Sequence, residues 1–274
     1  MASNAIRDTR VVLWRELLPV FHEPWGLFFS MIQPVIFLAL FGPLLGGVPT
    51  VPGEDSVWQW FVPGILVMLI LFATSMTGFG LLMEMQTGSH ERLMVTPMSR
   101  SAMIVGRAAK EIVPLFAQAA IIVLVMIPFG FQLHPLGALG GLAILCLLGV
   151  GLGALSYALA LVVHGQDWIF WTVQQTLVFP LTVLSGVFLP LESGPGWMQR
   201  AADINPITHI VEAERLLFAG TYDDSTILMG FAAALGFAIV GLWVGTSVIR
   251  RLELAVAGRR TTAEAGSSDA RASG

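Results

Sequence analysis

The sequence predicts an all-α, polytopic membrane protein with six transmembrane helices, an N-terminal interfacial helix and short extracellular helices before the last span. Hydrophobic residues make up 55% of the 274 residues and charged residues only 12%, against about 25% charged in soluble domains. Six runs lack Asp, Glu, Lys, Arg and His, and each approaches the roughly 20 residues that a helix needs to cross hydrocarbon. The runs are continuously apolar, whereas a membrane β-barrel would show alternating segments of about 10 residues.

The spans follow the apolar runs, and residues 1–257 form a single transmembrane domain. The third run is the shortest, and we begin its helix earlier because the long side chains before it can reach the interface. We place the spans at residues 27–45, 61–83, 105–128, 136–163, 168–190 and 227–249.

The N-terminal arm mixes apolar residues with arginines, a pattern that suits a helix lying in the membrane interface. An ordinary helical lead-in to the first span is the alternative. The charges are spread along the arm and no small-x-small cleavage site follows the first apolar run, so we expect the arm to be retained.

Basic residues gather in three places: the N-terminal arm, the connection after the second span, and the C-terminal tail. These segments hold three, four and five of the 14 Lys and Arg residues. Because Lys and Arg accumulate on the cytoplasmic side, we expect both termini in the cytoplasm of a multi-pass plasma-membrane protein. Residues 258–274 turn to Ala, Ser, Thr, Gly and Arg without apolar periodicity, which predicts a disordered tail.

The residue inventory excludes several chemistries. A P-loop needs a lysine followed by Ser or Thr, but the single lysine, Lys110, precedes Glu111. The five histidines are scattered, and the single cysteine, Cys146, rules out a disulfide or a multi-cysteine metal site. A net charge of -4 leaves no basic excess for nucleic acid. We therefore expect no enzyme activity, no metal and no cofactor in this chain.

The six runs also lack an intramembrane carboxylate, the group that commonly binds the driving ion of a coupled carrier. If the protein transports, its energy source is therefore a partner. An ion-coupled carrier with backbone-only sodium sites and a non-transporting membrane scaffold or assembly protein are the alternatives.

Residues 84–100 connect the second and third spans and form the most informative loop. A short amphipathic stretch leads to Thr96 and Pro97, an N-cap and first-turn pair that begins the next helix. A cytoplasmic partner can bind a short polar helical segment of this kind; a solvated loop is the alternative interpretation. The residues that we single out are Glu84, Glu91, Arg92, Thr96, Pro97 and Arg100.

Residues 191–226 contain two short helices, at about 197–202 and 207–218. Asn205 caps the second helix, Pro206 sits in its first turn, and Gly220 ends it. Glu214 falls within the apolar arc of this helix, which comprises Ile207, Ile210, Val211, Leu217 and Phe218. Glu214 is therefore a candidate to meet substrate or a partner arginine, or to form a structural pair with Arg200 or Arg215.

Polar side chains form a stripe on one face of the fifth span. Amides in hydrocarbon need partners, so the stripe faces either packed protein, including a dimer seam, or a translocation path. Its members are Trp171, Gln174, Gln175, Thr182 and Ser185. Glycine pairs with GxxxG spacing permit close helix approach, and we assign them to packing within the chain: Gly137/Gly141, Gly149/Gly153 and Gly241/Gly245.

Two of these segments resemble a known family. The run Glu91-Arg92-Leu-Met-Val-Thr96-Pro97-Met-Ser-Arg100, followed by Ile104-Val-Gly-Arg107, resembles the coupling loop of the ABC-transporter type-2 permeases, in their daunorubicin-resistance-like drug-exporter branch. Asn205-Pro206-Ile-Thr-His-Ile-Val-Glu-Ala-Glu214-Arg215-Leu-Leu-Phe-Ala-Gly220 resembles the outer segment before that family's last helix. The loop departs from relatives that carry a charged pair where Gln86 and Thr87 stand.

The resemblance implies the membrane subunit of an ATP-driven exporter of amphipathic or hydrophobic compounds such as drugs, antibiotics or lipids. It implies a homodimer, or a heterodimer with a sister permease, joined to two cytoplasmic ATPase subunits that bind ATP and Mg. In this family the loop with Glu91 and Arg92 inserts into the ATPase, and the short outer helices dip into the outer leaflet. A short helix that is bound by the ATPase and moves as a rigid body would move the second and third spans with it.

Overall fold

In the part of the chain that it describes, the computed structural model of this protein consists of helices joined by turns and contains no strand. It describes residues 24–45, 56–86, 112–163, 165–191 and 194–272, together with the single positions 11, 13, 14, 18, 106 and 110. The long helices are α2 (Pro24–Leu45), α3 (Val57–Gln86), α6 (Ile112–Met126), α7 (Pro135–Val162), α8 (Asp167–Val183) and α11 (Ser225–Ala272). The short ones are the 3₁₀ turn η1 (Ile127–Phe129) and the helices α9 (Gly196–Ile204) and α10 (Pro206–Phe218).

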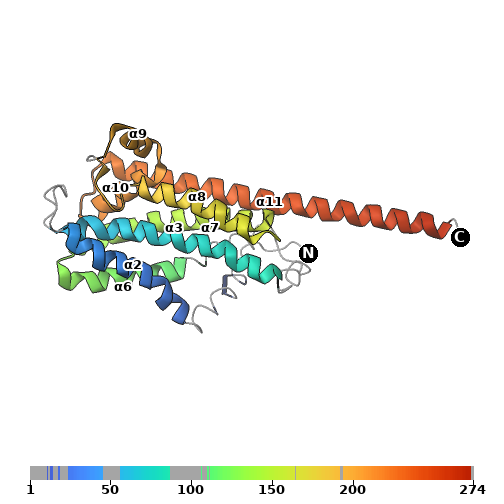
Figure 1. Cartoon of the computed structure of the whole chain (residues 1–274), viewed down its shortest axis with the longest axis horizontal. Coiled ribbons are helices and arrows are strands. Elements are labelled where there is room, and N and C mark those ends of the chain that lie inside the picture. The colour runs from blue at the N-terminus through green and yellow to red at the C-terminus, as the bar shows by residue number, and fades with distance from the viewer. Residues whose placement is uncertain are drawn as a thin grey trace.

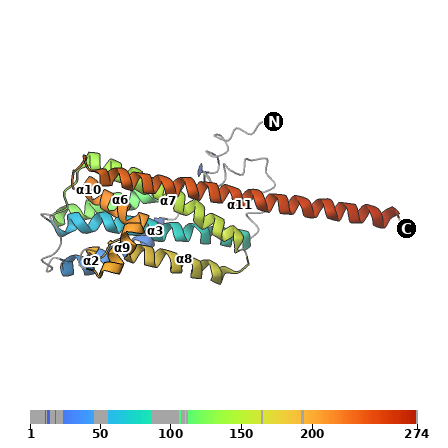
Figure 2. The ribbon, with the colours of Figure 1, turned by 90° about the horizontal axis from the view of Figure 1, so that it is seen from above.

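The long helices lie side by side and alternate in direction (Figures 1 and 2). The helices α2, α6 and α8 end where α3, α7 and α11 begin, and α9 and α10 lie at this end of the bundle (Figure 1). We call it the α10 end. Within the described residues, four helices are long and apolar enough to cross a membrane: 57–86, 112–129, 135–162 and 225–251. The other two apolar runs form the helices α2 and α8, so the all-helical membrane architecture is confirmed.

The fifth helix is shorter than its apolar run. We expected a span over 168–190, but α8 ends at Val183 and the chain turns at Gly186, whose φ of +74° favours glycine. Polar side chains of the α10 segment donate to the carbonyl oxygens freed there: Asn205 Nδ2 to Leu181, Thr208 Oγ1 to Leu184, and Arg215 Nη2 to Gly186. Because these carbonyls have partners, the helix can end inside an otherwise apolar sequence.

The last helix is longer than its apolar run. We expected a span over 227–249 and disorder from residue 258, whereas α11 continues as helical backbone to Ala272. Ala, Glu and Arg, which recur in this segment, have high intrinsic helix propensity, which accounts for the difference. Beyond the bundle this part of α11 projects alone (Figure 1).

The core centres on α3, whose residues Phe61, Val62, Ile65 and Leu66 are fully buried. The helix α7 packs along both α3 and α11. At the α7–α11 crossing Gly151 and Gly241 meet so closely that a β-carbon on Gly241 would overlap the Gly151 carbonyl oxygen. Gly137 and Gly141 of α7 face Leu217 and Glu214 of α10. These glycines therefore serve packing within the chain.

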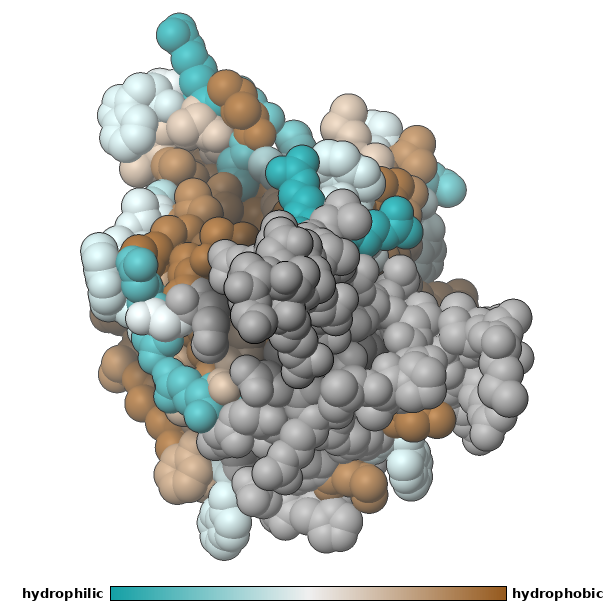
Figure 3. All heavy atoms as spheres, turned by 90° about the vertical axis from the view of Figure 1, so that its right-hand side faces the viewer, coloured by the Kyte–Doolittle hydropathy of each residue, from teal (hydrophilic) through white to brown (hydrophobic). Residues whose placement is uncertain are grey.

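Apolar side chains cover the flanks of the bundle. Seen from the end toward which α11 projects, brown hydrophobic residues gather around the sides and teal hydrophilic groups are scattered between them (Figure 3). Exposed aromatic residues include Trp25, Phe28, Trp168 and Trp243. In the N-terminal arm Val11, Leu13, Trp14 and Leu18 have helical backbone, while most of the expected interfacial helix lies outside the described residues.

Candidate functional site

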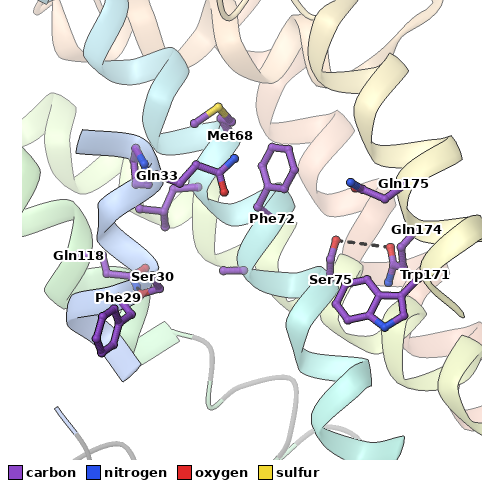
Figure 4. Close-up of a pocket in the computed structure, with 13 residues that line it drawn as sticks. Phe29, Ser30, Gln33, Met68, Phe72, Ser75, Gln118, Trp171, Gln174 and Gln175 are labelled. Atoms are coloured by element: carbon purple, nitrogen blue, oxygen red, sulfur yellow. Dashed lines mark hydrogen bonds between the residues drawn. The ribbon is translucent and has the colours of Figure 1, made fainter. Parts of the chain in front are cut away.

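A cavity of about 480 Å³ lies between α2, α3, α6 and α8 (Figure 4). Its wall combines amides and hydroxyls with aromatic and aliphatic side chains, and none of the described residues that line it is charged. The lining residues are Phe29, Ser30, Gln33, Pro34, Met68, Leu69, Phe72, Ala73, Ser75, Gln118, Trp171, Gln174 and Gln175.

Part of the predicted α8 stripe lines this cavity. Trp171, Gln174 and Gln175 all contribute to its wall. Gln174 also joins three helices: its Nε2 donates to Ser156 Oγ of α7 at 2.9 Å, and its Oε1 accepts from Ser75 Oγ of α3 at 3.5 Å (Figure 4). The Ser156 hydroxyl accepts in turn from the Gly78 amide, 3.1 Å away. Gln174 therefore both packs helices together and lines the cavity, so it fits the packing interpretation of the stripe as well as the path interpretation.

The stripe divides at the far end of α8. Thr182 and Ser185 are buried, each with only 1% of its surface exposed. Their hydroxyls donate to backbone carbonyls of the same segment, Thr182 to Val178 and Ser185 to Thr182. Neither residue lines the cavity, so the sequence periodicity overstates the length of its polar wall.

Sequence reasoning missed the other polar residues of the cavity. Gln33 comes from α2, while Gln118 of α6 donates to Ser30 Oγ of α2. Gln33 and Gln118 are each a single amide within an apolar run. This pattern could have identified them, because an amide in hydrocarbon needs a partner. Gln33 and Gln175 are exposed, so the cavity reaches the surface of the chain along its α2 and α8 walls.

An aromatic cluster follows the cavity toward the α10 end. One and two turns beyond Gln33, α2 carries Phe37 and Phe41, whose rings lie 5.1 and 5.6 Å from that of Phe188. Phe188 belongs to the turns after α8. The cluster therefore joins the two walls of the cavity where α2 and α8 approach the α10 end.

A second pocket, of about 440 Å³, lies at the α10 end. Its wall includes Ser185, Thr208 and Arg215, together with Asp203 and Glu212. Arg215 is the residue from the predicted outer motif that ties this region together, because it donates to the carbonyl oxygens of both Trp60 and Gly186. This pocket is polar and charged, in contrast to the cavity between α2 and α8.

The α10 helix has the predicted caps and the predicted buried face. The Asn205 side chain accepts from the Ile207 amide at 3.0 Å, Pro206 occupies the first turn, and Gly220 has a φ of +82°. Glu214 lies on the buried face with none of its surface exposed. The predicted structural pair of Glu214 with Arg200 or Arg215 is wrong: in the described part of the chain neither carboxylate oxygen has a hydrogen-bond partner.

Most of the expected partner loop falls outside the described residues: Glu91, Arg92, Thr96, Pro97 and Arg100. Glu84 lies half-buried in the last turn of α3. At the end of that helix Gln86 Nε2 donates to Asp167 Oδ2 of α8 at 2.6 Å. In the described part of the chain no three His, Cys, Asp or Glu residues gather as metal ligands.

Comparison with known proteins identifies relatives over most of this chain. The model of the "ABC-2 type transporter" family matches residues 7–219. The daunorubicin resistance ABC transporter permease protein DrrB1 of Streptomyces coeruleorubidus is 28% identical over 221 residues, which cover 80% of this chain and 77% of the relative. The putative transport permease ycf38 of Cyanophora paradoxa is 29% identical, covering 78% and 75%. The probable doxorubicin resistance ABC transporter permease protein DrrC of Mycobacterium tuberculosis (strain CDC 1551 / Oshkosh) is 23% identical, covering 68% and 67%.

Proposed function

Because this chain belongs to the ABC-2 type transporter family and is the membrane subunit of an exporter, we propose that the cavity between α2 and α8 receives its substrate. The uncharged mixture of amides, hydroxyls and aromatic rings carries this proposal. Ligand sites of this kind are mostly apolar with a few polar groups that fix orientation. The wall suits an amphipathic compound with an aromatic body and several hydrogen-bonding groups, such as daunorubicin.

A second permease copy completes the cavity in this proposal. Gln33 and Gln175 are exposed on its α2 and α8 walls. An amide that faces hydrocarbon lacks partners, so protein or substrate is the favoured neighbour. We therefore place the dimer seam, with an identical or sister chain, along α2 and α8, and the translocation path along the same seam. The Phe37–Phe41–Phe188 cluster closes this translocation path on the α10 side.

Two cytoplasmic ATPase subunits supply the energy in this proposal and hold ATP and Mg. The lone lysine of this chain has no P-loop context. The loop with Glu91, Arg92, Thr96, Pro97 and Arg100 is their docking element. The complex spans the plasma membrane through six helices per permease, with both permease termini in the cytoplasm and α9 and α10 on the extracellular side.

The test is substrate-stimulated ATPase activity and transport by the reconstituted permease–ATPase complex, with daunorubicin as the probe. We expect Gln175→Leu to lower transport several-fold at unchanged expression, because it removes a polar group from the wall. Thr176→Leu is the matched control, since Thr176 is exposed on α8 outside the cavity lining. Equal transport by both variants would contradict the assignment of the cavity.

The docking element is tested separately by reversing both charges, with Glu91→Arg and Arg92→Glu in one chain. We expect stimulated ATPase activity to fall while membrane insertion stays intact, because the two residues lie outside the spans. Wild-type coupling in this variant would exclude the loop as the contact. An inserted wild-type permease that copurifies with no ATPase would instead favour a scaffold or an ion-coupled carrier.

A further inference from the structure

Glu214 is a buried acid on the inner face of α10. Its side chain has no exposed surface, and in the described part of the chain neither carboxylate oxygen makes a hydrogen bond. Buried polar groups are almost always hydrogen-bonded, so an exception in a packed helix interface requires an explanation. The carboxyl of α10 lies against α7 at Gly141, where a β-carbon would overlap Glu214 Oε2, and beside the ring of Phe218.

The charged groups around Glu214 do not compensate a carboxylate. The next residue, Arg215, turns its guanidinium to the carbonyl oxygens of Trp60 and Gly186. His134, before α7, contacts the Phe218 carbonyl oxygen at 2.9 Å. Among the described residues, the thiol of Cys146 on α7 also interacts with Glu214, and it adds no positive charge.

The remaining described elements that pack on α10 contribute no cation either. The single acid or base in α3 is Glu84, in the last turn at the opposite end of the helix. In α11 no acid or base precedes Arg250. On α9, Arg200 and Asp203 are exposed, and on α10 itself His209 faces the Asp203 carbonyl oxygen and Glu212.

The physical consequence is a preference for the neutral acid. Removing an ionised carboxylate from water without a partner is costly, whereas the protonated form is tolerated. The helix α10 lies outside the spans, and burial raises the pKa of the Glu214 carboxyl from 4.5 to about 8. Protonation therefore favours the docked state, whose stability falls as pH rises from about 4.5 and is lost through about 8.

We propose that α10 is a proton-dependent latch: it stays docked on α7 while Glu214 is protonated, and it is released from α7 when Glu214 ionises. The inference goes beyond the export function, because it concerns the docking of one helix and requires no substrate. Solvent reaches the carboxyl only when α10 moves, so ionisation and release are coupled events. Alkaline conditions on the α10 side of the membrane would thus loosen the structure around the second pocket.

Hydrogen–deuterium exchange of α10 in the reconstituted complex tests the latch at pH 6.5 and 8.5. Comparison with Glu214→Gln at the same pH removes the intrinsic pH dependence of exchange. At pH 6.5 we already expect faster exchange in the wild type, because the carboxyl of the released helix ionises above about pH 4.5. Between pH 6.5 and 8.5 we expect the ratio of the α10 exchange rates, wild type over variant, to rise at least about tenfold, as linkage predicts for a carboxyl that binds its proton only when docked.

Two further variants make the outcome decisive. Glu214→Met fills the same space without a titratable group and should match Glu214→Gln, which keeps the test valid if the amide variant folds poorly. Asp223→Asn removes an exposed carboxylate from the loop after α10 and should keep the wild-type response. The latch is overturned if wild type and both Glu214 variants respond alike to pH, or if the Asp223 variant alone abolishes the response.

Discussion

Arg215 stacks on Trp60: the guanidinium carbon lies 3.8 Å from the centre of the indole ring, and Nε donates to the Trp60 carbonyl oxygen at 3.1 Å. The same guanidinium donates through Nη2 to Gly186 at 2.7 Å. One side chain of α10 therefore binds the first turn of α3 and the turn that ends α8. A planar group with several donors is required, because stacking and two divergent hydrogen bonds occur together.

Replacement of Arg215 by lysine should destabilise the protein although the charge is kept. An ammonium group cannot stack and donate to both carbonyls as the guanidinium does, so we expect a loss of about 1–3 kcal/mol and a lower midpoint of thermal unfolding in detergent. Arg200→Lys is the control, because Arg200 is exposed on α9. Equal midpoints for the two variants would show that the Arg215 contacts contribute nothing to stability.

Gly241→Ala should separate α7 from α11. The added methyl would overlap the Gly151 carbonyl oxygen, and backbone cannot yield as a flexible side chain does, so we expect about 1–3 kcal/mol of destabilisation. Gly236→Ala on the same helix meets no atom within 4 Å and should be neutral or slightly stabilising. Thermal unfolding of both variants measures the difference, and a silent Gly241→Ala would mean that the crossing is wider than described.

The two glutamines of α8 should separate stability from transport. Gln174→Leu loses the hydrogen bonds to Ser156 and Ser75, at about 0.6–2 kcal/mol for an interhelical bond in a membrane protein, and should lower the unfolding midpoint. Gln175→Leu should leave that midpoint unchanged, because Gln175 is exposed, and should lower transport. Parallel unfolding and transport assays decide, and the reverse pattern would contradict the division of roles.

Thiol labelling should reveal the orientation of the chain. In a Cys146→Ser background, cysteines at Gly53 and Ser193 should react with an impermeant reagent added to intact cells, while a cysteine at Ser267 should react only after lysis. The expectation rests on the basic residues of the N-terminal arm, the second connection and the tail. Labelling at Ser267 in intact cells would invert the proposed topology.

The helices of the bundle were predictable because their apolar runs dominate the local sequence. Asn205, Pro206 and Gly220 likewise fix α10 by local chemistry, and the structure places this helix at Pro206–Phe218. The end of α8 was not predictable in the same way. It depends on Asn205, Thr208 and Arg215, which lie 24 to 29 residues further along the chain, and no periodicity in the apolar run marks that contact.

The cavity was predicted only in part for the same reason. Trp171, Gln174 and Gln175 follow one another at helical spacing, so a single helix discloses them. Gln33 and Gln118 are single amides in separate helices, and only tertiary packing brings them to the same wall. The isolation of Glu214 could not be foreseen either, because the sequence offers an arginine next to it, and the structure turns that arginine toward Trp60.

The hydrogen bond between Gln86 and Asp167 has a mechanical consequence. Gln86 is the last residue of α3 and Asp167 the first of α8, and at the middle of the bundle Ser75 and Gln174 join the same two helices again. Two contacts between the same two helices hinder rotation as well as sliding of one helix against the other. A displacement of the chain just beyond Gln86 would therefore move α3 and α8 together, and with them one side of the cavity.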